Sequence, residues 1–317
     1  MATETEEFDG EVGPHGGGVT GAVSDWVNDH IRTVFLGPSL VALFVVFIYP
    51  AVMLVWLSLQ NTSGIGETFQ PAYNFSRIFG DPAFWNAAIN TLIYSFGSLF
   101  VSVGAGLVIA LALNKLVDQR VRNTYSTLIL ISWAVPLSIV GVTWRWMFNG
   151  ELGIVNKVLV DLGVLGGGYS WLANSTSAMV VVILADSWSR IPFAAVVLLA
   201  GLQSIPQEMY DAARIDGATT FQTFRNVTLP YLRPSFFVAG LITWMFAFRA
   251  FAIPFSTTGG GPAGATETLA VYIHRFGVQL LDYGFASAVS LILVAVTLVV
   301  ATGYVYFILE QMEEIEI

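Results

Sequence analysis

Residues 178–202 read AMVVVILADSWSRIPFAAVVLLAGL, in which Asp186 and Arg190 are the only charged side chains. An α-helix needs about 20 predominantly apolar residues to cross the hydrocarbon core of a bilayer. Within hydrocarbon every backbone N–H and C=O must find a partner inside the protein, and a helix satisfies these groups within its own segment. This segment is therefore predicted to be a membrane-spanning helix.

The rest of the chain has the same character, since 55% of its 317 residues are hydrophobic, 11% are charged and its mean hydropathy is +0.70. Soluble domains carry about 25% charged residues. A transmembrane β-barrel would show short alternating segments in place of long apolar runs. The sequence predicts an all-α membrane protein that occupies residues 31–309, with six transmembrane helices at 34–59, 84–113, 125–148, 178–202, 235–255 and 285–309.

Much of the net charge of −9 lies at the two ends of the chain. Residues 1–30 are acidic and glycine-rich and are predicted to be a disordered tail, and residues 310–317 form a second acidic tail. Two readings of this acidity stay open, namely solvated tails or adaptation of the surface to high salt. Either reading argues against a nucleic acid partner.

Lysine and arginine set the expected orientation, because cytoplasmic loops carry an excess of these residues. With both termini in the cytoplasm, the larger set of basic residues faces inward and the smaller set faces outward. The inner set is Arg32, Lys115, Arg120, Arg122, Arg214, Arg225 and Arg233, and the outer set is Arg77, Arg145, Lys157 and Arg275. The sequence therefore predicts a multi-pass protein of the cell membrane with cytoplasmic termini.

The chemistry of an enzyme or a metal site is missing from the sequence. There is no cysteine, and the three histidines, His15, His30 and His274, are scattered. No G-x-x-x-x-G-K-[ST], H-E-x-x-H or G-x-S-x-G pattern occurs. We expect no catalytic residue, no metal and no bound cofactor. A membrane enzyme or a secondary transporter with repeated halves would need features that are not evident.

The connection at residues 203–234 is the most informative loop and reads QSIPQEMYDAARIDGATTFQTFRNVTLPYLRP. Ser204 and Gln207 match a capping box that would start a short helix, and Gly217 is placed to end it. A second helix is expected over Thr220–Thr228, stopping before Pro230. Helices this short are not stable alone in water. They must pack either on a partner protein or on the chain's own bundle.

The residues of this loop resemble a known pattern. Asp211-Ala212-Ala213, then Gly217, then Val227-Thr228-Leu229-Pro230 resemble the EAA loop of importer-type ABC transporter permeases, which reads Glu-Ala-Ala, Gly and Ile-x-Leu-Pro. This chain departs from the pattern at Asp211, which replaces Glu, and at Val227, which replaces Ile. Because Asp is one carbon shorter, a contact made by the family's carboxylate is in doubt here.

Flanking residues narrow the resemblance to the carbohydrate-uptake branch of that superfamily, similar to the maltose and glycerol-phosphate permeases, over residues 34–309. The residues concerned are Trp188, Pro192-Phe193, Leu199–Pro206, Ile215–Ala218, Asn90-Thr91 and Gly259–Pro262. The resemblance implies an importer-type bundle with short cytoplasmic coupling helices, paired with a second homologous permease.

The resemblance also implies partners. Two ATPase subunits, which bind ATP and Mg²⁺, would dock on the loop, and an extracellular solute-binding protein would deliver the cargo. The implied coupling residues are Glu208, Asp211, Ala212, Ala213, Arg214, Asp216, Gly217, Val227, Leu229 and Pro230. The implied cargo is a mono- or oligosaccharide or a sugar or glycerol phosphate, with a peptide or a polyamine as the alternative.

Charges within the predicted spans point to two further features. Asp186 and Arg190 are one helical turn apart and are expected to form a structural ion pair. Binding sites for small molecules mix apolar and aromatic walls with a few polar groups. Trp244, Phe248, Arg249 and Phe251 fit such a substrate path. The alternative is that the aromatic rings pack within the bundle and that Arg249 pairs with another span or reaches the interface.

Overall fold

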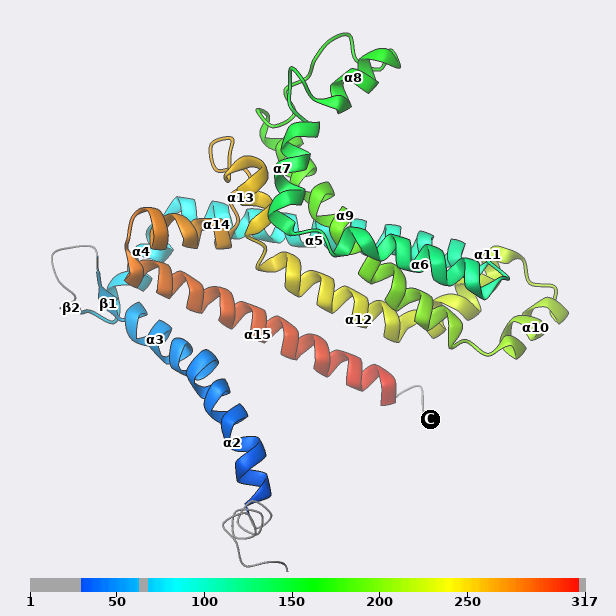
Figure 1. The fold of residues 1–317 in the computed structure, drawn as a ribbon, viewed down its shortest axis with the longest axis horizontal. Helices are drawn as coiled ribbons and strands as arrows, with labels where there is room; N and C mark the ends of the chain where they lie inside the picture. Colours follow the sequence, from blue (N-terminus) through cyan, green and yellow to red (C-terminus); the bar gives the residue numbers. More distant parts are fainter. Residues whose placement is uncertain (1–29, 63–67, 314–317) are drawn as a thin grey trace, which may run out of the picture. The chain divides into compact units, whose positions relative to one another are not determined.

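The computed structural model describes residues 30–62 and 68–313. The predicted tail at residues 1–30 lies outside this range except for His30. The chain divides into two compact units, Met1–Met53 and Leu54–Ile317. The elements labelled in Figure 1 are α2 (Ile31–Leu43), η1 (Phe44–Ile48), α3 (Tyr49–Ser58), β1 (Gln60–Asn61), β2 (Thr68–Phe69), α4 (Tyr73–Gly80), α5 (Pro82–Asn114), α6 (Gln119–Trp133), α7 (Leu137–Met147), α8 (Ile154–Asp161), α9 (Ser175–Gln203), α10 (Gln207–Ile215), α11 (Thr220–Thr223), η2 (Phe224–Thr228), α12 (Leu229–Phe248), α13 (Ala252–Thr258), α14 (Leu269–His274), η3 (Arg275–Gln279) and α15 (Tyr283–Glu313). The fold is therefore helical, apart from one short antiparallel ribbon that pairs β1 with β2.

Four predicted spans correspond to continuous apolar helices. Their membrane-length segments are Leu36–Ser58, Pro82–Asn114, Ser175–Gln203 and Tyr283–Tyr306. Helix α15 continues to Glu313, into the predicted tail at residues 310–317, because the residues there favour helix and nothing interrupts it. Residues 314–317 lie outside the described chain. With one bent pair counted as a single span, up to six helices can cross a membrane.

The third predicted span, residues 125–148, is not one straight helix. It consists of α6 and α7, which meet at an angle of 85°. Pro136 lies at the junction, as the residue just before the first residue of α7. Proline has no N–H to donate and it disfavours helical geometry at the residue before it. A proline inside an apolar run therefore produces a corner here, which the hydropathy of the run does not reveal.

The fifth predicted span, residues 235–255, is displaced. The helix runs from Thr220 to Phe248 through α11, η2 and α12. It ends at Arg249, which has φ −106° and ψ 20°, and α13 begins at Ala252. The short helix predicted over Thr220–Thr228 is therefore the first part of a long helix, and the expected stop before Pro230 was wrong.

A π-helical turn explains how the chain passes Pro230. η2 covers the five residues Phe224–Thr228, two positions before this proline. A π-turn widens the helix locally and changes its hydrogen-bond pattern, so a residue that cannot donate is accommodated. The same order occurs in the first span, where η1 ends at Ile48 and Pro50 follows.

Helices α5 and α9 pack closely side by side. A side chain at Gly97 would lie 2.7 Å from Ile183 Cδ1, and a side chain at Gly106 would lie 2.9 Å from Ala194 Cβ. At Gly106, where backbone atoms of Ala194 and Ala195 are also close, only glycine permits this approach without displacing the neighbouring helix. The contacts advance in the same direction along both helices, so α5 and α9 run parallel.

Helices α12 and α15 complete the bundle. Ser235 and Leu232 of α12 lie against Gly201 near the end of α9, and Tyr304 of α15 donates to the carbonyl of Phe237 at 2.8 Å. α12 therefore runs antiparallel to α5 and α9, and α15 runs antiparallel to α12. We call the end of the bundle that carries α10 the α10 end and the opposite end the α14 end. The C-terminal part of α15 lies toward the α10 end (Figure 1).

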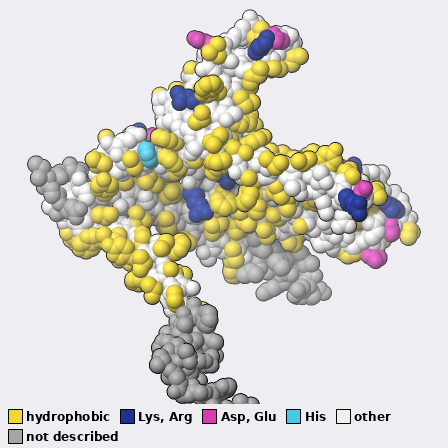
Figure 2. All heavy atoms as spheres, in the orientation of Figure 1, with side chains coloured by type: hydrophobic (Ala, Val, Ile, Leu, Met, Phe, Trp, Pro, Cys, Tyr) yellow, Lys and Arg dark blue, Asp and Glu magenta, His cyan; other side chains and the backbone are white. Residues whose placement is uncertain are grey.

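The surface of the bundle is apolar along its length. Figure 2 shows hydrophobic side chains across the middle of the visible face, with charged side chains gathered at the α10 end and around α8. Large exposed apolar side chains include Phe100 at 72%, Val108 at 67% and Val299 at 73% exposure. Such a surface suits lipid, which covers apolar groups without requiring polar partners.

A buried ion pair connects α9 to α5. The Nε of Arg190 lies 2.5 Å and its Nη2 lies 2.7 Å from the two carboxylate oxygens of Asp186. Ser98 of α5 also donates to this carboxylate. The Asp186 side chain is fully buried and that of Arg190 is 11% exposed. Two parallel N–H···O bonds are the strongest geometry available to an arginine and a carboxylate.

We predict that Asp186→Ala lowers the free energy of unfolding by about 3–5 kcal/mol, because it leaves the guanidinium of Arg190 buried and unpaired. The measurement is thermal unfolding of the purified chain in mild detergent. Asp161→Asn is the matched control, since it breaks the exposed Lys157–Asp161 pair and should cost less than about 1 kcal/mol. Equal unfolding midpoints for the two variants would contradict the prediction.

Candidate coupling site and transport path

The loop after α9 begins differently from the expected capping box. Ser204 is the last-turn residue of α9, and its hydroxyl donates to the carbonyl of Gly201 at 2.9 Å. Pro206 occupies the N-cap position of α10 and supplies no side-chain cap. The capping box of this loop is instead at Thr219 and Gln222, where each side chain bonds to the other residue's backbone N–H. The second helix is thus the capped one.

Gly217 ends α10, as predicted, in a left-handed conformation with φ +70°. The N–H of Gly217 donates to the carbonyl of Arg214 at 3.1 Å, and the N–H of Ala218 donates to that of Ala213 at 2.9 Å. These two bonds form a Schellman motif, which satisfies the last carbonyls of a helix. Because a side chain at Gly217 would meet no atom within 4 Å, backbone conformation is what requires glycine here.

One face of α10 is exposed and one face is anchored. The exposed predicted coupling residues are Glu208, Asp211, Ala212, Arg214, Asp216 and Gly217, whereas Ala213 is buried. Arg214 pairs with Asp211 at 3.0 Å, on the surface. The pair presents both charges to solvent, so it is available to a partner protein and adds little stability by itself.

Two exposed apolar side chains beside Gly217 were missed by the sequence analysis. Ile215 is 87% exposed and Phe221 is 70% exposed. They lie on either side of the turn that joins α10 to α11. Large apolar groups at such exposure on a polar loop mark a contact surface for another protein. The sequence could have revealed them, because the periodicity of the two short helices places this Ile and this Phe on the face that points away from the bundle.

The anchored side joins the loop to the bundle. Tyr210 and Val227 pack against a buried cluster that includes Ile205, Leu202 and Leu113. The hydroxyls of Tyr210 and Thr228 lie 3.4 Å apart. Of the remaining predicted residues, Leu229 is 37% exposed and Pro230 is half-buried. α10 is therefore attached to the ends of α5 and α9 and to the turn before α12.

The four predicted path residues fall into two groups. Trp244 and Phe248 are buried and stack on each other at 4.7 Å between ring centroids. The Nε1–H of Trp244 has no hydrogen-bond partner within the described residues. Arg249 is exposed, with its guanidinium 5.4 Å from the ring centroid of Phe246. Phe251 is half-buried and lies beside Phe255 and His274.

At the α14 end, the Asn90-Thr91 motif contacts the segment that follows the glycine-rich motif, far away in the sequence. Asn90 donates through Nδ2 to the carbonyls of Gly264 at 2.7 Å and Glu267 at 3.3 Å. Thr91 accepts from the N–H of Leu269 at 2.8 Å. These bonds hold the loop at residues 259–268 on α5. The sequence gave no indication that Asn90 and Thr91 contact this loop.

Charged groups on the 267–283 segment form two pairs. Arg275 contacts Glu267 at 3.1 Å, and Arg77 contacts Asp282 at 2.8 Å. Burial raises the pKa of Glu267 above its usual range, although Arg275 opposes the shift. Tyr272 donates to Asp81 at 2.6 Å, and burial together with this bond raises the pKa of Tyr272. These contacts tie α14 to the start of α5.

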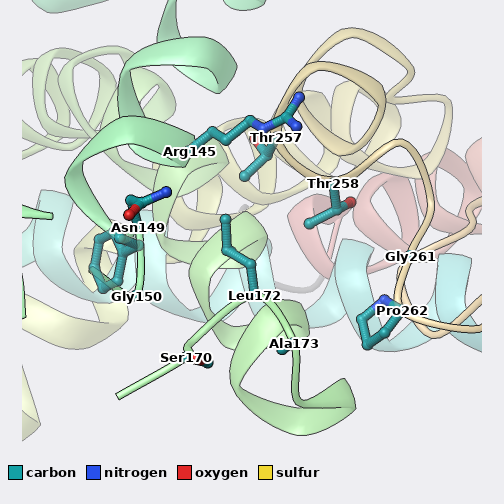
Figure 3. A pocket seen from close by; sticks show the side chains of 11 residues that line it. Arg145, Asn149, Gly150, Ser170, Leu172, Ala173, Thr257, Thr258, Gly261 and Pro262 are labelled. Carbon is teal, nitrogen blue, oxygen red and sulfur yellow. The ribbon is translucent and has the colours of Figure 1, made fainter. Parts of the chain in front are cut away.

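A pocket of about 410 Å³ opens beside the same loop (Figure 3). Arg145 extends from the last turn of α7 toward Thr257 and Thr258 of α13, and Leu172 and Pro262 lie on other walls. Its lining is Arg145, Phe148, Asn149, Gly150, Ser170, Leu172, Ala173, Thr257, Thr258, Gly261 and Pro262. The described residues contain no cluster of side chains suited to a metal ion.

Comparison with known proteins identifies the family of the chain. Residues 102–312 match the family model of the binding-protein-dependent transport system inner membrane component. The chain belongs to this family. It is therefore a permease of a binding-protein-dependent ABC importer and a multi-pass inner membrane protein, and ATP hydrolysis takes place in a separate subunit. The match includes the whole of α9, α10, α11 and α12.

Curated relatives cover most of the permease. It is 35% identical over 285 residues to the sulfoquinovosyl glycerol transport permease of Agrobacterium fabrum, covering 88% of this chain and 90% of that protein. It is 37% identical to the trehalose/maltose transport permease of Thermococcus litoralis, covering 80% and 85%. It is 35% identical to the sn-glycerol-3-phosphate transport permease of Pectobacterium atrosepticum, covering 82% and 88%.

A solved structure supports the fold of the permease. A chain of a bacterial ABC transporter involved in the import of the acidic polysaccharide alginate matches with a TM-score of 0.76 and 22% identity, covering 90% of this chain and 97% of that chain. The expectation of an importer-type permease bundle is confirmed.

We predict that Asn90→Ala loosens the 259–268 loop, because the carbonyls of Gly264 and Glu267 each lose a buried donor worth about 1–3 kcal/mol. Amide hydrogen exchange at residues 264–269 should accelerate, by roughly tenfold for each 1.4 kcal/mol lost. The matched control is Ser95→Ala, since Ser95 bonds to the carbonyl of Leu92 within its own helix. Unchanged exchange at residues 264–269 in Asn90→Ala would show that other contacts hold the loop.

Proposed function

We propose that this permease forms half of the path by which an ATP-driven importer takes up a carbohydrate. A second homologous permease supplies the other half. Two ATPase subunits dock on the α10–α11 loop, and a solute-binding protein delivers the cargo at the α14 end. The cargo is a mono- or oligosaccharide or a sugar or glycerol phosphate. The α10 end faces the cytoplasm, and both termini lie in the cytoplasm.

The docking part of the proposal is carried by the exposed face around Gly217. Ile215 and Phe221 offer apolar contact, and the Asp211–Arg214 pair offers charge of both signs. The anchored side of α10 packs against helices that cross the bilayer. A loop that is exposed on one side and fixed to the bundle on the other is suited to pass movement between a soluble subunit and the spans.

The cargo part of the proposal is supported by relatives at 35–37% identity, whose names specify sulfoquinovosyl glycerol, trehalose and maltose, and glycerol-3-phosphate. All are sugars or polyol derivatives. Trp244, Phe248, Arg249 and Phe251 remain our proposed path residues. The unpartnered indole N–H of Trp244 and the exposed guanidinium of Arg249 are donors that hydroxyl or anionic groups of a cargo can accept from.

The assembly is tested by purifying the tagged chain from its native host in mild detergent, with mass spectrometry of the proteins that accompany it. We expect an ATPase in twofold excess and a second permease with an EAA-type loop in equal amount. A chain that is intact but free of ATPase, in a detergent shown to preserve other importers, would contradict the proposed docking.

We predict that Gly217→Val uncouples ATP hydrolysis from uptake. A β-branched residue in the left-handed region costs about 1–2 kcal/mol, which changes the population of the native turn by a factor of roughly 5–30. Uptake into reconstituted vesicles should fall by a similar factor while the spans stay inserted. Gly217→Asn is the matched control and should keep most of the uptake, because asparagine tolerates this conformation. Normal uptake in Gly217→Val would rule out the turn as a coupling element.

We predict that Arg249→Ala weakens the response of ATP hydrolysis to the cargo, because it removes a cation from the path. The concentration of cargo for half-maximal stimulation should rise at least fivefold, as expected when a charge-assisted hydrogen bond worth about 1.5–3 kcal/mol is lost. Arg249→Lys should retain part of the response. An unchanged dose response would favour the alternative in which Arg249 serves packing alone.

A further inference from the structure

Away from the α10 end, four of the six basic side chains of the Leu54–Ile317 unit contact a carboxylate. The pairs are Arg77 with Asp282, Lys157 with Asp161, Arg190 with Asp186, and Arg275 with Glu267. In this part of the described chain, Arg145 and Arg249 are the two basic residues that have no such contact. Arg249 belongs to the path already proposed. Arg145 is part of a separate cavity, the pocket of Figure 3.

The lining of this pocket contains one cation and no acidic residue. Its other polar side chains are Asn149, Ser170, Thr257 and Thr258. Asn149 uses its Oδ1 to accept from the N–H groups of Glu151 and Leu152, both at 3.0 Å. This leaves its Nδ2 as a donor in the lining of the pocket that also contains Arg145. The hydroxyl of Ser170 adds a third donor. A pocket with several donors and a net positive charge favours an anion.

The walls are held in place by bonds of their own. Thr266 donates to the carbonyl of Gly261 at 2.7 Å, and the hydroxyls of Thr258 and Thr266 lie 2.6 Å apart. Thr257 donates to the carbonyl of Gly141 at 3.2 Å, which joins α13 to α7. Together with the Asn90 bonds to the 259–268 loop, these contacts fix the pocket before a ligand arrives. A preformed site loses less entropy on binding.

One wall of the pocket suits a sugar ring. Phe148 stacks on Trp144 at 5.4 Å between centroids, with only 8° between the ring planes. Aromatic faces pack against the C–H groups of a pyranose, while donors reach its oxygen atoms. The volume of about 410 Å³ is within the range of small-molecule sites.

The position of the pocket relative to the coupling loop agrees with an entry site. The pocket includes residues 170–173, just before α9, and the coupling loop starts just after α9. Helix α9 has 29 residues, so the two lie about 43 Å apart along its axis. The pocket is therefore at the membrane face opposite to the ATPase side.

We propose that this pocket binds the anionic group of a carbohydrate cargo, a carboxylate, sulfonate or phosphate, with Arg145 as its counter-charge. The proposal rests on the proposed function and adds a charge to the cargo. The planar guanidinium of Arg145 can donate two parallel bonds to such a group, while Asn149 and Ser170 donate to the remaining oxygens. The cargo then continues from the α14 end into the path.

The test compares the binding of a charged sugar with that of its neutral counterpart. The first pair is galacturonate and galactose, and the second pair is glucose 6-phosphate and glucose. Binding is measured by equilibrium dialysis to the importer complex in lipid nanodiscs. The wild-type complex should bind the charged member of a pair at least about tenfold more tightly, as expected for a charge-assisted bond. Arg145→Gln should remove this preference and leave the affinity for the neutral sugar unchanged, and Arg145→Lys should retain part of it.

Arg120→Gln is the matched control, since Arg120 is exposed at the α10 end and should leave the preference intact. Equal affinity of the wild-type complex for both members of each pair would overturn the anionic site and leave carbohydrate import standing. No binding of any sugar would overturn both. A third outcome is that Arg145→Gln still prefers the charged sugar but needs more binding protein for half-maximal ATP hydrolysis. This result would assign Arg145 to the binding-protein interface and overturn the proposal.

Discussion

The close contact between α5 and α9 is the constraint on which the rest of the permease depends. Gly97 and Gly106 bring the two helix backbones together, and the Asp186–Arg190 pair with Ser98 fixes their register in the middle. Because α5 and α9 run parallel, their starts lie at one end of the bundle and their ends at the other, and each end carries one region of the proposed function. The starts of α5 and α9 hold the 259–268 loop and the Arg145 pocket. Their ends hold α10 and the apolar cluster beneath it.

The sequence predicted the spans well wherever an apolar run forms one straight helix. It failed at two prolines, Pro136 and Pro230, because hydropathy records how apolar a segment is and says nothing of its direction. Pro136 turns the chain through 85°, although the run on both sides is apolar. Pro230 was expected to stop a helix, yet the π-turn before it lets the helix continue. The same residue type thus gave opposite outcomes, and the difference lies in the backbone of the preceding turn.

The coupling site was predicted in part. The spacing from Asp211 to Pro230 indicated the loop, and Gly217 ends α10 as predicted, because its conformation is a local property of a few residues. Ile215 and Phe221 were missed, since their exposure depends on how the loop is anchored through Tyr210 and Val227. Likewise, the contact between Asn90 and Gly264 joins positions 174 residues apart. A single sequence does not show which distant polar groups are close in space.

The continuous helix from Thr220 to Phe248 has a mechanical consequence. It is one rod of 29 residues, and Pro234 lies midway along it. A proline in a helix interior removes one backbone hydrogen bond and makes that point the easiest to bend. A tilt about this midpoint displaces the two ends by equal amounts in opposite directions. Because the helix bends most easily at Pro234, the stiffness of this one point sets how much of a displacement at Thr220 reaches Phe248.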